Sequence, residues 1–258
     1  DGLCNNTVSA IYQDSEGFLW IGTQNGLSRF DGYDFINYQF NPKDSNSIYV
    51  EIVNDVVEID NNIWIGSNKG VCVFNKATQK YSYFNNIPSE DTGSVNIDHA
   101  NAIISDNRGS VWIGTFKNGL YKYNISTGKV RNYSVENTDG GLINNRVSRL
   151  RFDDDSVLWI LTYGGLCKYD YETDKFSGYS SKMFNENSEI YSMLDDNRGN
   201  ILLATNNKLI KFNKKNEIYE PYPDPDNIIG NSIFYIERLD DNTIWVATEQ
   251  LGLIIINE

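Results

Sequence analysis

Residues 11–35, IYQDSEGFLWIGTQNGLSRFDGYDF, decide the fold because their pattern returns along the chain. The centre of this stretch is Trp-Ile-Gly-Thr at 20–23. It recurs as Trp-Ile-Gly-Ser at 64–67, Trp-Ile-Gly-Thr at 112–115 and Trp-Ile-Leu-Thr at 159–162, and more weakly as Leu-Leu-Ala-Thr at 202–205 and Trp-Val-Ala-Thr at 245–248. The intervals of 44, 48, 47, 43 and 43 residues are typical of a β-propeller blade made of four short strands.

Each copy predicts the same series of antiparallel strands. An apolar first strand such as 8–14 leads into an Asp-rich turn such as 14–17, where Asp accepts backbone hydrogen bonds and Gly takes a positive φ. The second strand carries the Trp, and a Gly-containing turn leads to the third and fourth strands. Alternation with a period of two is evident, and no stretch shows a convincing helical period. The sequence therefore predicts an all-β propeller of six four-stranded antiparallel blades, the last incomplete.

We expect residues 1–258 to form a single β-propeller domain that is a piece of a longer chain. A chain of 258 residues with 40% hydrophobic residues can bury one large core. The sixth copy stops after its third strand. The predicted blades span about 8–40, 52–84, 99–134, 146–180, 189–222 and 232–258.

The marker residues of the repeat have predicted structural roles. A large aromatic side chain can fill the wedge between twisted neighbouring blades, which is the role predicted for Trp20, Trp64, Trp112, Trp159 and Trp245. A hydroxyl recurs where the second strand ends, and we expect it to bond the backbone of the following turn. These hydroxyl residues are Thr23, Ser67, Thr115, Thr162, Thr205 and Thr248.

Composition argues against several classes of partner. The net charge of -13 disfavours nucleic acid and anionic membranes, because both need clustered Lys and Arg. No apolar run approaches the roughly 20 residues that span a bilayer, and residues 1–7 lack the features of a signal peptide. Cys4, Cys72 and Cys167 are odd in number and widely spaced, so we expect buried free thiols.

The residues for catalysis are sparse. His99 is the single histidine, which excludes a multi-histidine metal site, and no Gly-x-Ser-x-Gly motif is present. The Asp-rich stretches at 153–155 and 224–226 lack the spacing of a calcium loop and are interpreted as turns. We therefore predict no catalytic residue, metal or cofactor; a lyase-type enzyme, with His99 as its most obvious residue, is a third hypothesis.

The repeat resembles the two-component regulator propeller repeat. The resemblance rests on Asp, a turn, Gly, apolar-Trp-Ile-Gly-Thr, Gly-Leu and apolar-Phe-Asp, best at 11–35 and nearly as good at 103–124. The fifth and sixth copies depart from it at Leu202, Ala204 and Ala247. The resemblance implies part of the extracytoplasmic sensor region of a bacterial hybrid histidine kinase, periplasmic or at the cell surface. It also implies oligosaccharide-derived signals, adjacent domains of the same receptor as partners, and a homodimer.

In a propeller, the turns before the first strands and the turns between the second and third strands share one face, which is the usual ligand site. Amides, charges and aromatic rings on this face suit a sugar. The entry turns contribute Asn6, Glu51, Asp98, His99, Asn145, Arg146, Glu189 and Asn231, and the other turns contribute Gln24, Asn25, Asn68, Lys69, Phe116, Lys117, Tyr163, Asn206, Glu249 and Gln250. We predict a non-enzymatic module that senses an extracellular oligosaccharide; the alternative is a rigid scaffold for protein or dimer contacts.

Overall fold

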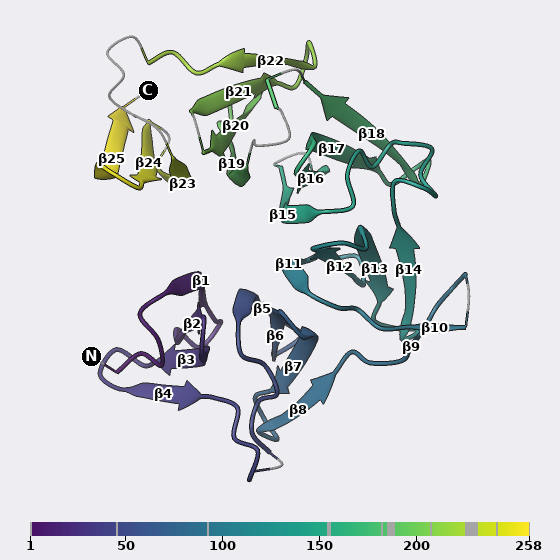
Figure 1. Ribbon diagram of the computed structural model, residues 1–258, viewed down its shortest axis with the longest axis vertical. Helices are drawn as coiled ribbons and strands as arrows, with labels where there is room; N and C mark the ends of the chain where they lie inside the picture. The colour runs from purple at the N-terminus through teal and green to yellow at the C-terminus, as the bar shows by residue number, and fades with distance from the viewer. Residues whose placement is uncertain are drawn as a thin grey trace. The chain divides into compact units, whose positions relative to one another are not determined.

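The computed structural model describes residues 2–44, 46–91, 93–153, 156–181, 183–184, 189–206, 208–224, 232–240 and 242–257. Throughout these residues the secondary structure is strand and turn, with no helix, and therefore no helix that could cross a bilayer. Six antiparallel sheets follow one another, each with its strands in sequence order (Figure 1). Five have four strands and the sixth has three. The predicted six-bladed propeller with an incomplete last blade is confirmed.

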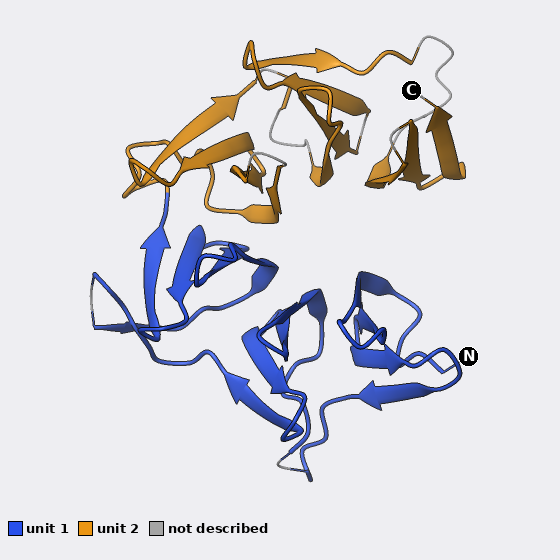
Figure 2. Ribbon diagram, turned by 180° about the vertical axis from the view of Figure 1, so that it is seen from behind, with its two compact units in different colours: residues 1–134 blue, residues 135–258 orange. Residues whose placement is uncertain are grey.

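The chain divides into two compact units, residues 1–134 and 135–258 (Figure 2). Unit 1 holds blades 1 to 3. Blade 1 comprises β1 (Val8–Gln13), β2 (Leu19–Thr23), β3 (Gly26–Phe30) and β4 (Phe35–Tyr38); blade 2 comprises β5 (Val53–Ile59), β6 (Asn62–Ser67), β7 (Gly70–Asn75) and β8 (Lys80–Tyr83); blade 3 comprises β11 (Ala100–Ser105), β12 (Ser110–Thr115), β13 (Leu120–Asn124) and β14 (Lys129–Tyr133). A short ribbon that the sequence did not predict, β9 (Ile87–Pro88) with β10 (Ser94–Val95), precedes blade 3.

Unit 2 holds blades 4 to 6. Blade 4 comprises β15 (Val147–Phe152), β16 (Leu158–Thr162), β17 (Gly165–Asp170) and β18 (Lys175–Ser180); blade 5 comprises β19 (Ile190–Asp195), β20 (Asn200–Thr205), β21 (Leu209–Asn213) and β22 (Ile218–Pro221); blade 6 comprises β23 (Ile233–Asp240), β24 (Thr243–Thr248) and β25 (Gly252–Asn257). The assignment of all 258 residues to one domain stays a prediction.

The hydrophobic cores lie between blades. One cluster joins Trp20 of blade 1 to Phe74 of blade 2, and a second joins Trp64 of blade 2 to Ile113 of blade 3. In unit 2, a third cluster joins blades 4 and 5, and a fourth joins blades 5 and 6. Each sheet is therefore stabilised mainly by its neighbours, as in other repeat proteins.

Four of the five tryptophans are buried: Trp20, Trp64, Trp112 and Trp159 are each at most 7% exposed. Trp20 and Trp159 pack against a Phe of the following blade at 5.8 Å between ring centroids, as the predicted wedge role requires. Trp245 is different because it is 38% exposed. Within unit 2 the described residues leave this indole partly uncovered, and the wedge role of Trp245 stays a prediction.

Local hydrogen bonds explain the recurring turn residues. Each hydroxyl at the end of a second strand donates to a backbone carbonyl of the following turn, at 2.7–3.1 Å. Asp14 accepts the backbone N–H groups of Glu16 and Phe18 through one oxygen and the Trp20 indole N–H through the other. Asp153 binds the Trp159 indole in the same way, at 2.9 Å. The repeat thus couples its Asp to its Trp.

The three cysteines are free thiols. Cys72 and Cys167 are buried, and burial raises the pKa of each thiol to about 12. Cys4 is only half-buried, contrary to the prediction, because it lies in the segment before β1, where its Sγ contacts the Thr23 hydroxyl at 3.2 Å.

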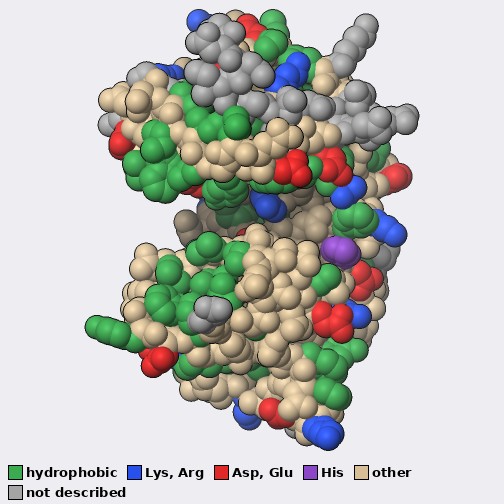
Figure 3. Space-filling view, turned by 60° about the vertical axis from the view of Figure 1, so that its left-hand side comes forward, with side chains coloured by type: hydrophobic (Ala, Val, Ile, Leu, Met, Phe, Trp, Pro, Cys, Tyr) green, Lys and Arg blue, Asp and Glu red, His purple; other side chains and the backbone are tan. Residues whose placement is uncertain are grey.

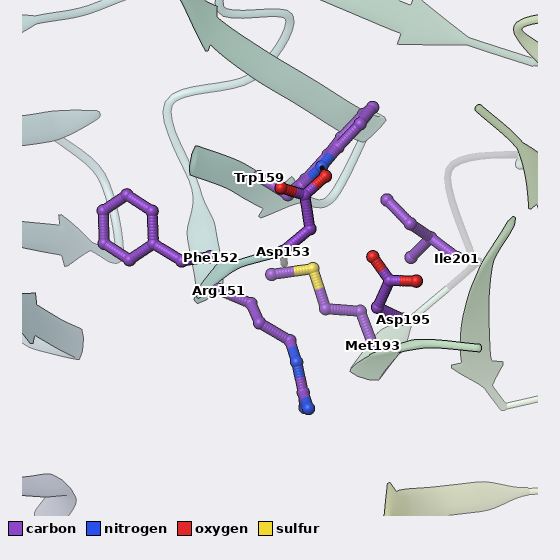
Figure 4. Close-up of a pocket in the computed structure, with 7 residues that line it drawn as sticks. All are labelled: Arg151, Phe152, Asp153, Trp159, Met193, Asp195 and Ile201. Atoms are coloured by element: carbon purple, nitrogen blue, oxygen red, sulfur yellow. Dashed lines mark hydrogen bonds between the residues drawn. The ribbon is translucent and has the colours of Figure 1, made fainter. Parts of the chain in front are cut away.

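Two lysines link neighbouring blades through carboxylates. Lys76 of blade 2 lies 2.5 Å from Glu58 in its own blade and 3.6 Å from Asp14 of blade 1. Lys214 of blade 5 repeats the arrangement, 2.7 Å from Asp195 in its own blade and 3.4 Å from Asp153 of blade 4. Asp153 and Asp195 line a small pocket between blades 4 and 5, together with Trp159, Met193 and Ile201 (Figure 4).

Candidate ligand-binding face

One backbone hydrogen bond recurs in all six blades and brings the two predicted sets of turns together. The N–H of the first residue after the second strand donates to the carbonyl of the residue before the first strand, at 3.0–3.2 Å. The pairs are Gln24 with Thr7, Asn68 with Ile52, Phe116 with His99, Tyr163 with Arg146, Asn206 with Glu189, and Glu249 with Ser232. The entry turn and the second turn of each blade therefore lie together at one end of its strands.

The predicted residues of unit 1 occupy this end with unequal roles. Glu51 and Asp98 are exposed and stand one residue before the bonded position, and the Glu51 carbonyl accepts the Gly26 N–H of blade 1. Asn68 is held in the turn, because its Oδ1 accepts the Ile52 N–H at 3.2 Å. Gln24 and Lys117 are exposed.

Phe116 and His99 form a stacked pair in blade 3. Their ring centroids lie 4.8 Å apart with an interplanar angle of 21°. The backbone bond between the same two residues fixes this stack. Among the described residues, no group of three or more His, Cys, Asp or Glu side chains could hold a metal ion.

Arg146 and Tyr163 form the equivalent pair in blade 4. The guanidinium carbon lies 3.5 Å from the centre of the Tyr163 ring, which is a close cation–π contact. Burial raises the pKa of the Tyr163 hydroxyl, and the Arg146 charge opposes that rise. The pair gives blade 4 a half-buried surface with a positive charge and a phenol group.

A β-bulge interrupts the first strand of every blade at its second residue. The register with the second strand shifts there, so this residue has no cross-strand partner. The bulge residues are Ser9, Asn54, Asn101, Ser148, Tyr191 and Phe234. Four are small and polar. In blades 1 and 2 the bulge side chain reaches the next blade, since Ser9 donates to the Val53 carbonyl and Asn54 donates to the Ala100 carbonyl.

Blades 5 and 6 replace this polar residue with an aromatic ring. Tyr191 and Phe234 pack on each other with centroids 5.3 Å apart. The Tyr191 hydroxyl donates to the Glu189 carboxylate, while Phe234 remains 45% exposed. Bulges change the direction of side chains and are frequent beside functional sites. The aromatic residues at this position therefore make blades 5 and 6 candidates for a binding site.

Arg149 and Tyr235 each follow the bulge residue of their strand, in blades 4 and 6, and add to this group of side chains. Tyr235 is 48% exposed, and Arg149 is half-buried. The charge of Arg149 acts on both the Tyr163 and Tyr235 hydroxyls, opposing the rise in their pKa that burial causes. Arg151, two residues along the same strand, lies 3.8 Å from the Glu237 carboxylate of β23, so the first strands of blades 4 and 6 come close at this edge. We call this surface the first-strand edge of unit 2: Arg146, Arg149, Tyr163, Glu189, Tyr191, Phe234 and Tyr235.

Sequence reasoning found three of these seven residues as Arg146, Tyr163 and Glu189, and it missed the other four. The missed residues lie on first strands, whereas the sequence-based candidates all come from turns. Aligning the six first strands at their opening apolar residue singles out Tyr191 and Phe234, because they interrupt a column of Ser and Asn. Asn231, Asp154, Asp155, Pro225 and Asp226 lie outside the described residues.

Comparison with known proteins shows what this chain resembles. Residues 2–25 match the family model described as the two component regulator propeller. The chain carries this repeat. A stretch of 48 residues is 52% identical to the curated protein named Histidine kinase P4 of Formosa agariphila, and covers 19% of this chain and 4% of that protein. The resemblance of this chain's repeat to the two-component regulator propeller repeat is thereby confirmed.

Similar solved structures extend the likeness to nearly the whole chain. The extracellular domain of a putative hybrid two component system from B. thetaiotaomicron is 30% identical, with a TM-score of 0.83 over 99% of this chain and 34% of that one. The corresponding domain of a second such system from that organism is 23% identical, with a TM-score of 0.78 over 98% of this chain and 32% of that one, and shows the fold alone. The chain thus spans about a third of the length of these structures.

Proposed function

We propose that this chain is a ligand-recognising module in the extracytoplasmic part of a two-component receptor, and that it binds an oligosaccharide at the first-strand edge of unit 2. The observation that carries the proposal is the change at the bulge, from Ser or Asn in blades 1 to 4 to Tyr191 and Phe234 in blades 5 and 6. The similarity to an extracellular domain of a hybrid system supports the location.

The chemistry of this edge suits a sugar. Exposed aromatic faces pack against the C–H faces of pyranose rings, and Phe234 and Tyr235 are each nearly half exposed. Sugar hydroxyls need donors and acceptors together, which the Tyr163 hydroxyl and the Glu189 carboxylate provide. Three blades contribute, so a ligand several rings long can contact all of them.

The role is recognition rather than catalysis. In a sensor, the ligand binds two arrangements of the receptor with unequal affinity. It therefore shifts their populations. The partners in this proposal are the neighbouring domains of the same receptor and a second copy of it.

The test replaces both rings by the residue that the chain itself uses at the same bulge. Tyr191→Ser with Phe234→Ser keeps the bulge geometry, because Ser9 and Ser148 occupy it in blades 1 and 4. Thermal shift and calorimetry against an oligosaccharide panel should show saturable binding by the parent chain and at least about 10-fold weaker binding by the double variant.

The control is Tyr33→Ser, which removes an aromatic ring that is 91% exposed in the turn before β4. This variant should bind like the parent chain. No saturable shift from any glycan, in a chain shown to be folded, would remove the proposal.

A protein-contact role is the second candidate, and the open face of blade 6 favours it. Trp245 lies opposite Ile255 in the sheet, and Leu253 lies opposite Ala247, so these apolar residues share a face. Trp245, Leu253 and Ile255 are 38%, 55% and 57% exposed. Figure 3 shows hydrophobic side chains at the surface of one side of the molecule. A concentration-dependent dimer that Leu253→Asp abolishes, without any glycan binding, would favour this role.

A further inference from the structure

We infer that the first-strand edge of unit 2 selects an acidic oligosaccharide, with the Arg149 guanidinium receiving a carboxylate or sulfate group of the sugar. This inference rests on the proposed function and adds the chemical class of the ligand. It comes from the placement of one cation among exposed aromatic rings on a strongly acidic chain.

Arg149 is placed to meet a ligand. It follows the bulge in β15, and its one hydrogen bond among the described residues runs from Nη1 to the neighbouring Ser148 carbonyl at 3.0 Å. No carboxylate of the described residues lies within ion-pair distance of Arg149, although the chain holds 35 acidic residues against 22 basic ones. Most of its guanidinium donors thus remain open to an incoming anion.

Most of the other charges around Arg149 are already engaged. Arg151, two residues further along β15, lies 3.8 Å from the Glu237 carboxylate of blade 6. Glu189 accepts the Tyr191 hydroxyl, and Arg146 lies over the Tyr163 ring. Glu249, in contrast, is exposed, and its charge adds to the effect of burial in raising the pKa of the Tyr191 hydroxyl. Within the described part of unit 2, Arg149 is therefore the cation of this edge with neither a carboxylate nor an aromatic ring assigned to it.

Guanidinium chemistry defines what the site takes. The planar fork of Arg matches a carboxylate or sulfate through two parallel hydrogen bonds, and such charge-assisted bonds are about twice as strong as neutral ones. Tyr163 of the same blade adds a hydroxyl group, whereas the Tyr235 hydroxyl already donates to the Glu237 carboxylate at 3.0 Å. Phe234 and Tyr235 offer faces to the ring that carries the charge. A uronate or sulfated sugar satisfies all of these groups, and a neutral sugar leaves the cation without a counterpart.

The experiment compares ligands that differ only in charge. Trigalacturonic acid is titrated by calorimetry against the full 258-residue chain, beside its trimethyl ester, which keeps the rings and removes the charges. A sulfated galactose trisaccharide beside its desulfated form distinguishes the two sources of negative charge. We expect one acidic member to bind at least about 10-fold more tightly than its neutral counterpart.

Variants then locate the selectivity. Arg149→Gln should weaken binding of the acidic sugar about 10-fold and leave the neutral sugar unchanged, and Arg149→Lys should restore part of the loss because it keeps the charge without the fork. Arg198→Gln is the matched control. It also removes one positive charge, but from the turn between β19 and β20, at the end of β19 opposite to the bulge. This variant should change the affinity for neither the acidic nor the neutral sugar.

The outcomes separate this inference from the function on which it rests. Equal binding of acidic and neutral sugars, or unchanged selectivity in Arg149→Gln, overturns the acidic class while oligosaccharide recognition stands. Binding of neutral glycans alone does the same. If no acidic or neutral glycan binds to the folded chain, both the inference and the proposed function are wrong.

Discussion

At the scale of single residues, the Lys76 cluster is a polar link between blades 1 and 2. The Lys76 ammonium lies 2.5 Å from Glu58, 2.7 Å from Glu16 and 3.6 Å from Asp14, and its side chain is 9% exposed. Burial alone would raise the pKa of Asp14 and of Glu58. Hydrogen bonds from Trp20 to Asp14 and from Lys76 to Glu58 outweigh burial, and both pKa values are lowered.

We predict that Lys76→Met lowers the free energy of unfolding by about 3 kcal/mol at pH 7, because it leaves buried carboxylates without their cation. The lowered pKa values mean that the cluster stabilises the fold above about pH 4.5 and loses this effect as the pH falls and the carboxylates take up protons. The cost of the substitution should therefore shrink near pH 3. Urea unfolding at both pH values measures it, with the exposed Lys129→Met as control. An equal loss at both pH values would contradict the electrostatic account.

At the scale of the strand and turn, blade 3 offers two glycines in similar backbone conformations with different surroundings. Gly109, in the first turn, has φ +92 and nothing within 4 Å of an added Cβ. Gly119, before β13, has φ +75, and an added Cβ would lie 2.1 Å from the Tyr133 carbonyl oxygen of β14. The first position thus requires only a left-handed backbone, whereas the second also requires the absence of a side chain.

Gly109→Ala should therefore cost about 1–2 kcal/mol, the penalty of the left-handed backbone. Gly119→Ala should cost more than about 3 kcal/mol, since β13 and β14 must also separate. Thermal unfolding of the two variants, measured side by side, tests the difference. Equal losses would mean that the backbone conformation alone matters at both turns.

The elements also show how far the sequence could lead. The strands, the Asp turns and the Thr hydroxyl bonds were predictable because each is a local interaction that recurs in every copy. The exposure of Trp245 was not, because it depends on whether another blade covers the sheet. Tyr191 and Phe234 were missed because alternation along a strand does not reveal a bulge, which only the pairing with the second strand defines.

At the scale of the whole molecule, charge is the dominant property. A net charge of -13 makes the folded chain repel itself at pH 7, where the pI of about 4.5 is far below the solution pH. Screening lengths fall from about 30 Å at 0.01 M salt to about 8 Å at 0.15 M. Long-range repulsion between exposed carboxylates is therefore screened, while the close contacts of Lys76 and Lys214 are affected much less.

Raising NaCl from about 0.01 M to 0.15 M at pH 7 should consequently raise the midpoint of thermal unfolding by on the order of 2 °C. The same change at pH 4.5 should have little effect, because the net charge is then close to zero. Calorimetric scans at both pH values, repeated with KCl to separate screening from ion-specific effects, make the comparison. A midpoint that falls with salt at pH 7 would mean that ion pairs such as those of Lys76 and Lys214 outweigh the repulsion. The charges of the chain would then have a net stabilising effect on the fold.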